Sequence, residues 1–214
     1  MAGWEMDRRD MSMNCASGNR IVTPKRIALY GGTFDPLHLG HLLVARAAME
    51  EMQLEKVYFI PTAQSPFKPD QLPTPPQTRL QMLRIGLAGN PDYEVDEQEI
   101  ERGGISYTID TVRDYQKRFG ESHLSFVIGA DHVPSLPKWR DAGELASSLH
   151  FIVIPRPGEN DVVFPTGYKG VVLRGFPLGV SSSQIRQRVR DKLTVRHLVP
   201  NAVEQAIVYN GLYL

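Results

Sequence analysis

Short, almost continuous apolar runs alternate with amphipathic segments along most of this chain. The apolar runs are expected strands and lie at residues 27–30, 56–60, 124–128, 151–154 and 171–173, with a shorter one at 93–95. Helices are expected at residues 42–52, 78–87, 107–119, 182–192 and 201–210. Strands that are apolar along their length are typical of a parallel sheet covered by helices. The sequence therefore predicts an α/β fold, a Rossmann-like doubly wound parallel sheet with helices on both faces.

The size and charge of the chain restrict the classes of protein to which it can belong. Its 214 residues fit one folded domain over residues 26–214, preceded by a flexible tail at residues 1–25 that lacks periodicity. The 24 basic and 24 acidic residues cancel, which disfavours broad binding to nucleic acid or to a membrane. Cys15 is the single cysteine, and neither a spanning segment nor a signal peptide is evident. We expect a cytoplasmic protein, and the oligomeric state stays open, with a homodimer as one option.

The loop between the first expected strand and helix carries the most informative residues, Gly31-Gly32-Thr33-Phe34-Asp35-Pro36-Leu37-His38-Leu39-Gly40-His41. A glycine pair lies where the strand stops, and two histidines lie where the helix begins. Glycine lets a backbone approach a ligand closely, and a helix N-terminus presents unpaired N–H groups to anions. Imidazoles can donate further hydrogen bonds to phosphate oxygens. We therefore expect a nucleoside triphosphate here, although a turn and a helix cap would explain each part taken alone.

This loop resembles the His-x-Gly-His motif of the nucleotidyltransferase superfamily, and its fuller form is similar to that of bacterial nicotinate-nucleotide adenylyltransferases. The resemblance runs from about Arg26 to the C-terminus. It implies transfer of the adenylyl group of ATP to nicotinate mononucleotide, which gives deamido-NAD and pyrophosphate. Mg²⁺ is expected to bind through the ATP phosphates. Neither the P-loop pattern nor the dinucleotide-binding glycine pattern follows the first strand.

Two later segments complete the expected ATP site. Gly129-Ala130-Asp131 ends a strand and offers a carboxylate to ribose hydroxyls, and Ser181-Ser182-Ser183-Gln184-Ile185-Arg186 resembles the family's Ser-Ser-Thr-x-Ile-Arg. In a doubly wound sheet these segments and the first loop would meet at one crevice. The resemblance assigns ATP binding to Gly31, Gly32, Thr33, Phe34, His38, His41, Gly129, Asp131, Ser181, Ser182 and Arg186.

Three of these residues are the catalytic candidates. His38 and His41 would orient ATP and donate to its phosphate oxygens, and Arg186 would neutralise the leaving triphosphate portion. An ordinary capped turn or a serine-capped helix remains an alternative for each later segment.

The acceptor is expected between a second helix start and a tryptophan. In the resembled enzymes, the segment matching Ser106-Tyr107-Thr108 gives backbone N–H groups to the nicotinate carboxylate, and a tryptophan at the spacing of Trp139 stacks on the pyridine. No Asp or Glu lies from Gly103 to Ile109, so this helix start should favour a carboxylate over a neutral amide. Asp35 and Lys68 complete the acceptor set. An ordinary cap, a tryptophan that anchors a loop and a solvated lysine are the alternatives.

Two other functions compete with this one. A related nucleotidyltransferase could use another acceptor, nicotinamide mononucleotide or phosphopantetheine, and a non-catalytic regulator could bind the nucleotide without turnover. Intact His38, His41 and Arg186 favour an enzyme. A class I aminoacyl-tRNA synthetase is disfavoured by the short, neutral chain and by the absence of a Lys-Met-Ser-Lys-Ser loop.

Overall fold

The computed structural model describes residues 26–66, 73–120, 122–155, 162–176 and 178–214. The expected tail, with Cys15, lies outside the described residues, and so does Lys68. Within the described chain the strands form one six-stranded sheet in the order β3-β2-β1-β4-β5-β6. Their bounds are β1 Arg26–Gly32, β2 Lys56–Pro61, β3 Tyr93–Val95, β4 His123–Gly129, β5 His150–Ile154 and β6 Lys169–Val172.

Every pairing in this sheet is parallel, and strand order reverses between β1 and β4. Each strand was expected within a few residues of its observed bounds, and the predicted doubly wound fold is confirmed. The strands form because their residues are β-branched, aromatic or otherwise apolar and can be buried on both faces.

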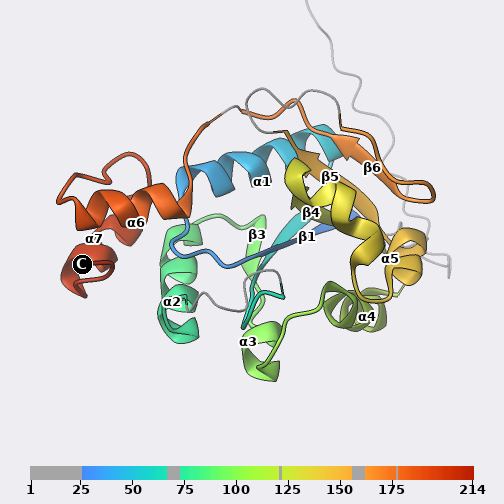
Figure 1. The fold of residues 1–214 in the computed structure, drawn as a ribbon, viewed down its shortest axis with the longest axis horizontal. Helices are drawn as coiled ribbons and strands as arrows, with labels where there is room; N and C mark the ends of the chain where they lie inside the picture. Colours follow the sequence, from blue (N-terminus) through green and yellow to red (C-terminus); the bar gives the residue numbers. More distant parts are fainter. Residues whose placement is uncertain (1–25, 67–72, 121, 156–161, 177) are drawn as a thin grey trace, which may run out of the picture.

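Helices cover both faces of the sheet, as Figure 1 shows. Their bounds are α1 Leu39–Met52, α2 Pro76–Leu87, α3 Gln98–Arg102, α4 Thr108–Phe119, the 3₁₀ helix η1 Ala130–Lys138, α5 Ala142–Ser148, α6 Ser182–Arg190 and α7 Asn201–Tyr209. The sequence did not predict α3, η1 or α5. These are short segments with few periodic apolar positions, and the two prolines inside η1 are residues that usually end a helix. Within the described chain, no helix is both long and apolar enough to cross a membrane.

The alternating residues of β1 divide the core into two layers. Ala28 and Tyr30 pack with the alanine-rich face of α1, whereas Ile27 and Leu29 pack with α4 and η1. A third apolar cluster joins α2, α6 and α7 at one end of the molecule. This cluster brings the C-terminal part of the chain beside the loop that follows β1.

Candidate active site

Two adjoining cavities open at the carboxyl ends of β1 and β4. The α4 cavity, of about 510 Å³, lies among the start of α4, helix η1 and the ends of both strands, and includes Gly31 and Gly32 in its wall. The α6 cavity, of about 990 Å³, lies between the loop after β1 and the start of α6. Both cavities are lined by Thr33, His38 and His41. The motif histidines therefore lie on the wall that the cavities share, at the predicted reversal of strand order.

His38 and His41 stack on each other at the start of α1. Their ring centroids lie 3.6 Å apart, and their planes are inclined by 22°. The backbone N–H of His38, the N-cap of α1, donates to Nδ1 of His41 over 3.2 Å. Because Nδ1 of His41 accepts this bond, the proton of the neutral ring resides on Nε2. His41 therefore keeps a ring N–H that can donate to a ligand.

Burial keeps both imidazoles uncharged. It lowers the pKa of His38 from 6.5 to about 4. Burial also lowers the pKa of His41 well below 6.5, and the neighbouring His38 lowers it further. At neutral pH the pair consists of neutral hydrogen-bond donors, so it can orient phosphate oxygens without adding positive charge.

Two glycines are required by close packing against site residues. A Cβ atom at Gly40 would lie 2.9 Å from Nδ1 of His38 and 3.1 Å from Cγ1 of Val180. At Gly129 a Cβ atom would lie 2.5 Å from Oδ1 of Asp131. A side chain at either position would displace a predicted site residue.

Buried side chains hold the loop after β1 in place. Phe34 has a left-handed backbone with φ of 48°, and its buried ring lies edge-on to His41 at a centroid distance of 5.0 Å. Asp35 is also buried: Oδ1 accepts from the Tyr213 hydroxyl over 2.7 Å, and Oδ2 accepts from the Thr74 amide over 3.0 Å. Asp35, which the sequence grouped with the acceptor, lies in the wall of the α6 cavity.

Arg79 of α2 joins the loop after β1 to the connection between β2 and α2. Its side chain is completely buried. It donates to the carbonyl oxygens of Thr74 and Thr33 over 2.8 Å and of Thr62 over 2.9 Å. Thr33 lies after β1, whereas Thr62 and Thr74 lie near the two ends of the connection from β2 to α2, so Arg79 fixes these segments relative to one another.

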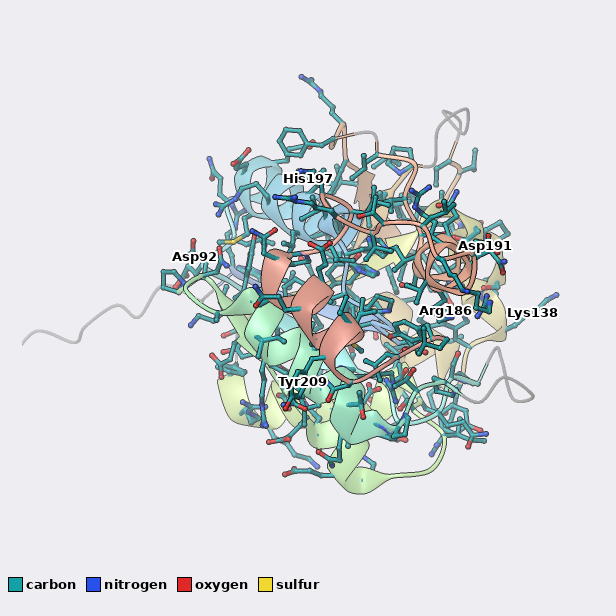
Figure 2. All side chains as sticks on the ribbon, turned by 90° about the vertical axis from the view of Figure 1, so that its left-hand side faces the viewer. Asp92, Lys138, Arg186, Asp191, His197 and Tyr209 are labelled. Atoms are coloured by element: carbon teal, nitrogen blue, oxygen red, sulfur yellow. The ribbon has the colours of Figure 1, made fainter. Side chains whose placement is uncertain are left out.

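The start of α6 carries the predicted serines and arginine. Ser181 is the N-cap of this helix, and the hydroxyl of Ser182 donates to the carbonyl of Pro36 over 2.9 Å. Arg186 donates to the carbonyl of Asp35 over 2.7 Å and lines the α6 cavity with both serines. The helix start is thus attached to the histidine loop, and Figure 2 shows Arg186 on α6.

The predicted carboxylate-binding segment lies at the start of α4, although part of it serves the fold. Ser106 donates its amide to the carbonyl of Gln64 over 2.9 Å, and its hydroxyl accepts from the amide of Ala63 over 3.0 Å. Tyr107 is the N-cap and Thr108 the first helical residue. The first N–H groups of a helix have no acceptor within that helix, so this start can bind an anion in the α4 cavity.

Two carboxylates lie close to the start of α4, although the segment from Gly103 to Ile109 contains no Asp or Glu. Asp110 is in the first turn of α4. Glu99 of α3 is buried in the wall of the α4 cavity, where its Oε1 accepts from the Thr111 hydroxyl over 2.6 Å. Burial raises the pKa of Glu99. The expectation of a helix start without acidic neighbours is therefore wrong: Asp110 directly follows Ile109, and Glu99 is brought in because α3 folds back against α4.

Trp139 follows η1 and lines the α4 cavity together with Asp131. Its indole N–H donates to the hydroxyl of Ser135 over 3.2 Å. The indole is also edge-on to Phe126 of β4, at a centroid distance of 6.2 Å. The tryptophan is therefore held at the cavity wall with a defined orientation. Lys138 beside it also lines this cavity.

Every predicted site residue within the described chain lines one of the two cavities. Sequence reasoning missed Arg79, Tyr213, Glu99 and Arg140. A charged residue beside the buried Leu80 was the one available signal for Arg79. The other three lie far in sequence from the motifs or carry no motif of their own.

Comparisons with known proteins identify the family of this chain. Residues 29–188 match the cytidylyltransferase-like family. A curated relative from Moorella thermoacetica, named "Probable nicotinate-nucleotide adenylyltransferase", is 40% identical over 205 residues, which cover 91% of this chain and 94% of the relative. A relative of the same name from Gemmatimonas aurantiaca is 41% identical over 195 residues, which cover 88% and 92%.

A solved structure shares the fold. The Plasmodium falciparum nicotinic acid mononucleotide adenylyltransferase, complexed with NaAD, has a TM-score of 0.72 at 17% identity and matches over 88% of this chain and 97% of its own. At that identity the likeness concerns the fold alone. The relatives and the family match show that the chain belongs to the cytidylyltransferase-like family and, within it, to the nicotinate-nucleotide adenylyltransferases.

Proposed function

We propose that the two cavities hold the substrates of adenylyl transfer from ATP to nicotinate mononucleotide, the reaction in NAD biosynthesis for which this family is named. The triphosphate lies in the α6 cavity, against Ser181, Ser182 and Arg186. The α4 cavity takes the pyridine of the acceptor against Trp139 and the ribose of ATP against Asp131. One observation carries this assignment: the neutral, stacked histidine pair forms part of the wall that the two cavities share.

The chemistry follows from the phosphate groups. A phosphate oxygen of nicotinate mononucleotide attacks the α-phosphorus of ATP, while the bond from that phosphorus to the pyrophosphate oxygen breaks. The attacking phosphate monoester has a second pKa near ~6, so it is mostly a dianion at neutral pH and needs no general base. This agrees with a histidine pair that donates hydrogen bonds rather than removing a proton.

The protein supplies positioning and electrostatic stabilisation. Neutral imidazole N–H groups orient phosphate oxygens, and Arg186 offsets the negative charge that grows on the departing pyrophosphate. Mg²⁺ arrives as part of the MgATP substrate. Such an ion commonly keeps several waters and binds mainly to phosphate oxygens. Within the described residues, no group of three or more His, Cys, Asp or Glu could hold a metal ion.

Two further properties stay predictions. An ATP-dependent biosynthetic enzyme with one cysteine is expected in the cytoplasm. A homodimer is one option for the oligomeric state, which sedimentation would measure.

The test is release of pyrophosphate from MgATP with nicotinate mononucleotide, nicotinamide mononucleotide and phosphopantetheine offered in parallel. We expect nicotinate mononucleotide to be preferred to the amide by roughly tenfold to a hundredfold in kcat/KM. A donor left unpaired by the amide costs about 1–3 kcal/mol, and about 1.4 kcal/mol is a factor of ten. Equal values for acid and amide would indicate a dual-specificity enzyme. Release with phosphopantetheine alone, or with none of the three, would overturn the assignment.

A further inference from the structure

The start of α4 has an electrostatic problem as an anion site. Asp110 is the third residue of this helix, close to the N–H groups that would receive a carboxylate. An acidic side chain there stabilises the helix through its dipole, but it repels an incoming anion. The buried carboxyl of Glu99 lies in the same cavity wall. A preference for the acid over the amide therefore requires a compensating cation.

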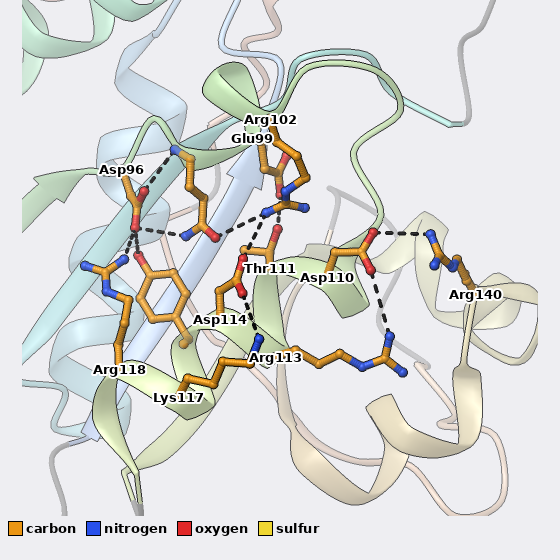
Figure 3. A network of polar contacts seen from close by, with 12 residues as sticks. Asp96, Glu99, Arg102, Asp110, Thr111, Arg113, Asp114, Lys117, Arg118 and Arg140 are labelled. Atoms are coloured by element: carbon orange, nitrogen blue, oxygen red, sulfur yellow. Dashed lines mark hydrogen bonds and ion pairs between the residues drawn. The ribbon is translucent and has the colours of Figure 1, made fainter.

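Arg140 lies where such a cation is needed. Its guanidinium donates to Oδ2 of Asp110 over 3.2 Å, and its Cζ lies 4.7 Å from the ring centroid of Tyr107. Figure 3 shows the arginine reaching this carboxylate from the segment that follows η1. Arg140 lines the α4 cavity, whereas Asp110 is absent from the wall formed by the described residues. The arginine directly follows Trp139, so the cation and the predicted stacking ring have adjacent backbones.

The other arginine near Asp110 is engaged elsewhere. Arg113 lies 3.9 Å from Oδ1 of Asp110, but it donates to Glu144 over 2.9 Å and to Asp141 over 3.0 Å. Its charge is therefore shared among three carboxylates, and it is absent from the described wall of the α4 cavity. Arg140 is the cation of this network that faces the cavity.

We propose that Arg140 is a specificity-determining residue: its guanidinium offsets Asp110, so that the start of α4 attracts the carboxylate of a pyridine acid more strongly than a neutral amide. This inference rests on the proposed function. The guanidinium acts through charge at the cavity rim, and its contact with Tyr107 holds it there.

The test compares kcat/KM for nicotinate mononucleotide and nicotinamide mononucleotide in variants. In Arg140→Gln we expect the acid-to-amide ratio to fall about five- to tenfold, the effect of one charge a few ångströms away in a partly solvated site. Arg140→Lys keeps the charge and should retain most of the preference. Asp110→Asn should raise the ratio, and the double variant Asp110→Asn/Arg140→Gln should return toward wild type. The effect of Arg140→Gln should also shrink at high salt.

Lys117→Gln is the matched control, because Lys117 pairs with Asp114 of the same helix at 3.6 Å and is absent from the described wall of either cavity. It should leave the acid-to-amide ratio unchanged.

If Arg140→Gln lowers kcat/KM equally for both substrates, the arginine only packs on Tyr107 and the proposal is overturned. The assay of the wild-type chain separates the proposed function from the inference about Arg140. No pyrophosphate release with nicotinate mononucleotide would overturn the proposed function and this inference together, whereas wild-type acid preference that persists in Arg140→Gln would overturn the inference alone.

Discussion

The two cavities are built in different ways. The α6 cavity is lined by two motifs, each contiguous in sequence, at the starts of α1 and α6. They supply neutral imidazoles, serine hydroxyls and Arg186, whose guanidinium donates to the carbonyl of Asp35. The α4 cavity draws its wall from β4, η1, α3 and the start of α4, and its charges belong to a network of ion pairs. The first depends on local backbone geometry, and the second on how distant segments pack.

This difference suggests which changes each region tolerates. A triphosphate is the same in every reaction of a nucleotidyltransferase, so a fixed set of donors suits the α6 cavity. The acceptor must be distinguished from similar molecules, and discrimination is a difference between two affinities. Charges placed by tertiary packing can set that difference without altering phosphate binding.

The largest expected effect is at the wall that the cavities share. His41→Ala and His38→Ala should each lower kcat by about 10²–10³-fold, the usual cost of removing one preorganised donor to a transition state. The measurement is pyrophosphate release at saturating substrates, with circular dichroism to confirm the fold. Near wild-type turnover in both folded variants would contradict the role given to the pair.

Trp139→Ala should raise KM for the acid and the amide alike, by about tenfold, because stacking on an aromatic side chain contributes about 1–3 kcal/mol and reads the ring rather than its substituent. Trp139→Phe keeps a stacking face and serves as the control. A change in the acid-to-amide ratio in Trp139→Ala would mean that the α4 cavity does not separate stacking from charge.

A smaller effect is expected at the C-terminal end of the chain, on the α6 side. Tyr213→Phe removes the hydroxyl that donates to Asp35 and should raise KM for ATP about two- to tenfold, the range of one hydrogen bond. Tyr209→Phe is the control, since Tyr209 is 90% exposed on α7 (Figure 2). Equal KM values for ATP in the two variants would show that this hydrogen bond does not position the loop.

The smallest effect concerns stability against pH. Burial lowers the pKa of His38 to about 4 in the folded chain, from 6.5 in the unfolded chain. Between these two pH values the unfolded state therefore binds more protons than the folded state. The free energy of unfolding that this group contributes is therefore complete above pH 6.5 and decreases as the pH falls toward 4. Urea titrations at pH 7.5 and pH 5 should show a smaller decrease in His38→Gln than in the wild type. An identical decrease in both proteins would contradict the burial of a neutral ring.

Much of the α6 cavity could be predicted from the order of residues alone. His38, Gly40 and His41 follow one strand and begin one helix, so their relative positions are fixed by a few backbone angles. Ser181 and Arg186 lie within two turns of another helix start, for the same reason. The near-continuous apolar strands predicted the parallel sheet, and therefore the end of the sheet at which these segments meet.

The tertiary structure decided what surrounds those motifs. Glu99 reaches the start of α4 because α3 packs against it, Tyr213 reaches Asp35 because α7 packs on α2, and Arg79 joins loops that are distant in sequence. The sequence by itself determined the apolar strands of the parallel sheet and the phosphate-binding motifs, since these depend on local periodicity and spacing. The charges near the acceptor depended on packing between segments, which no local pattern records.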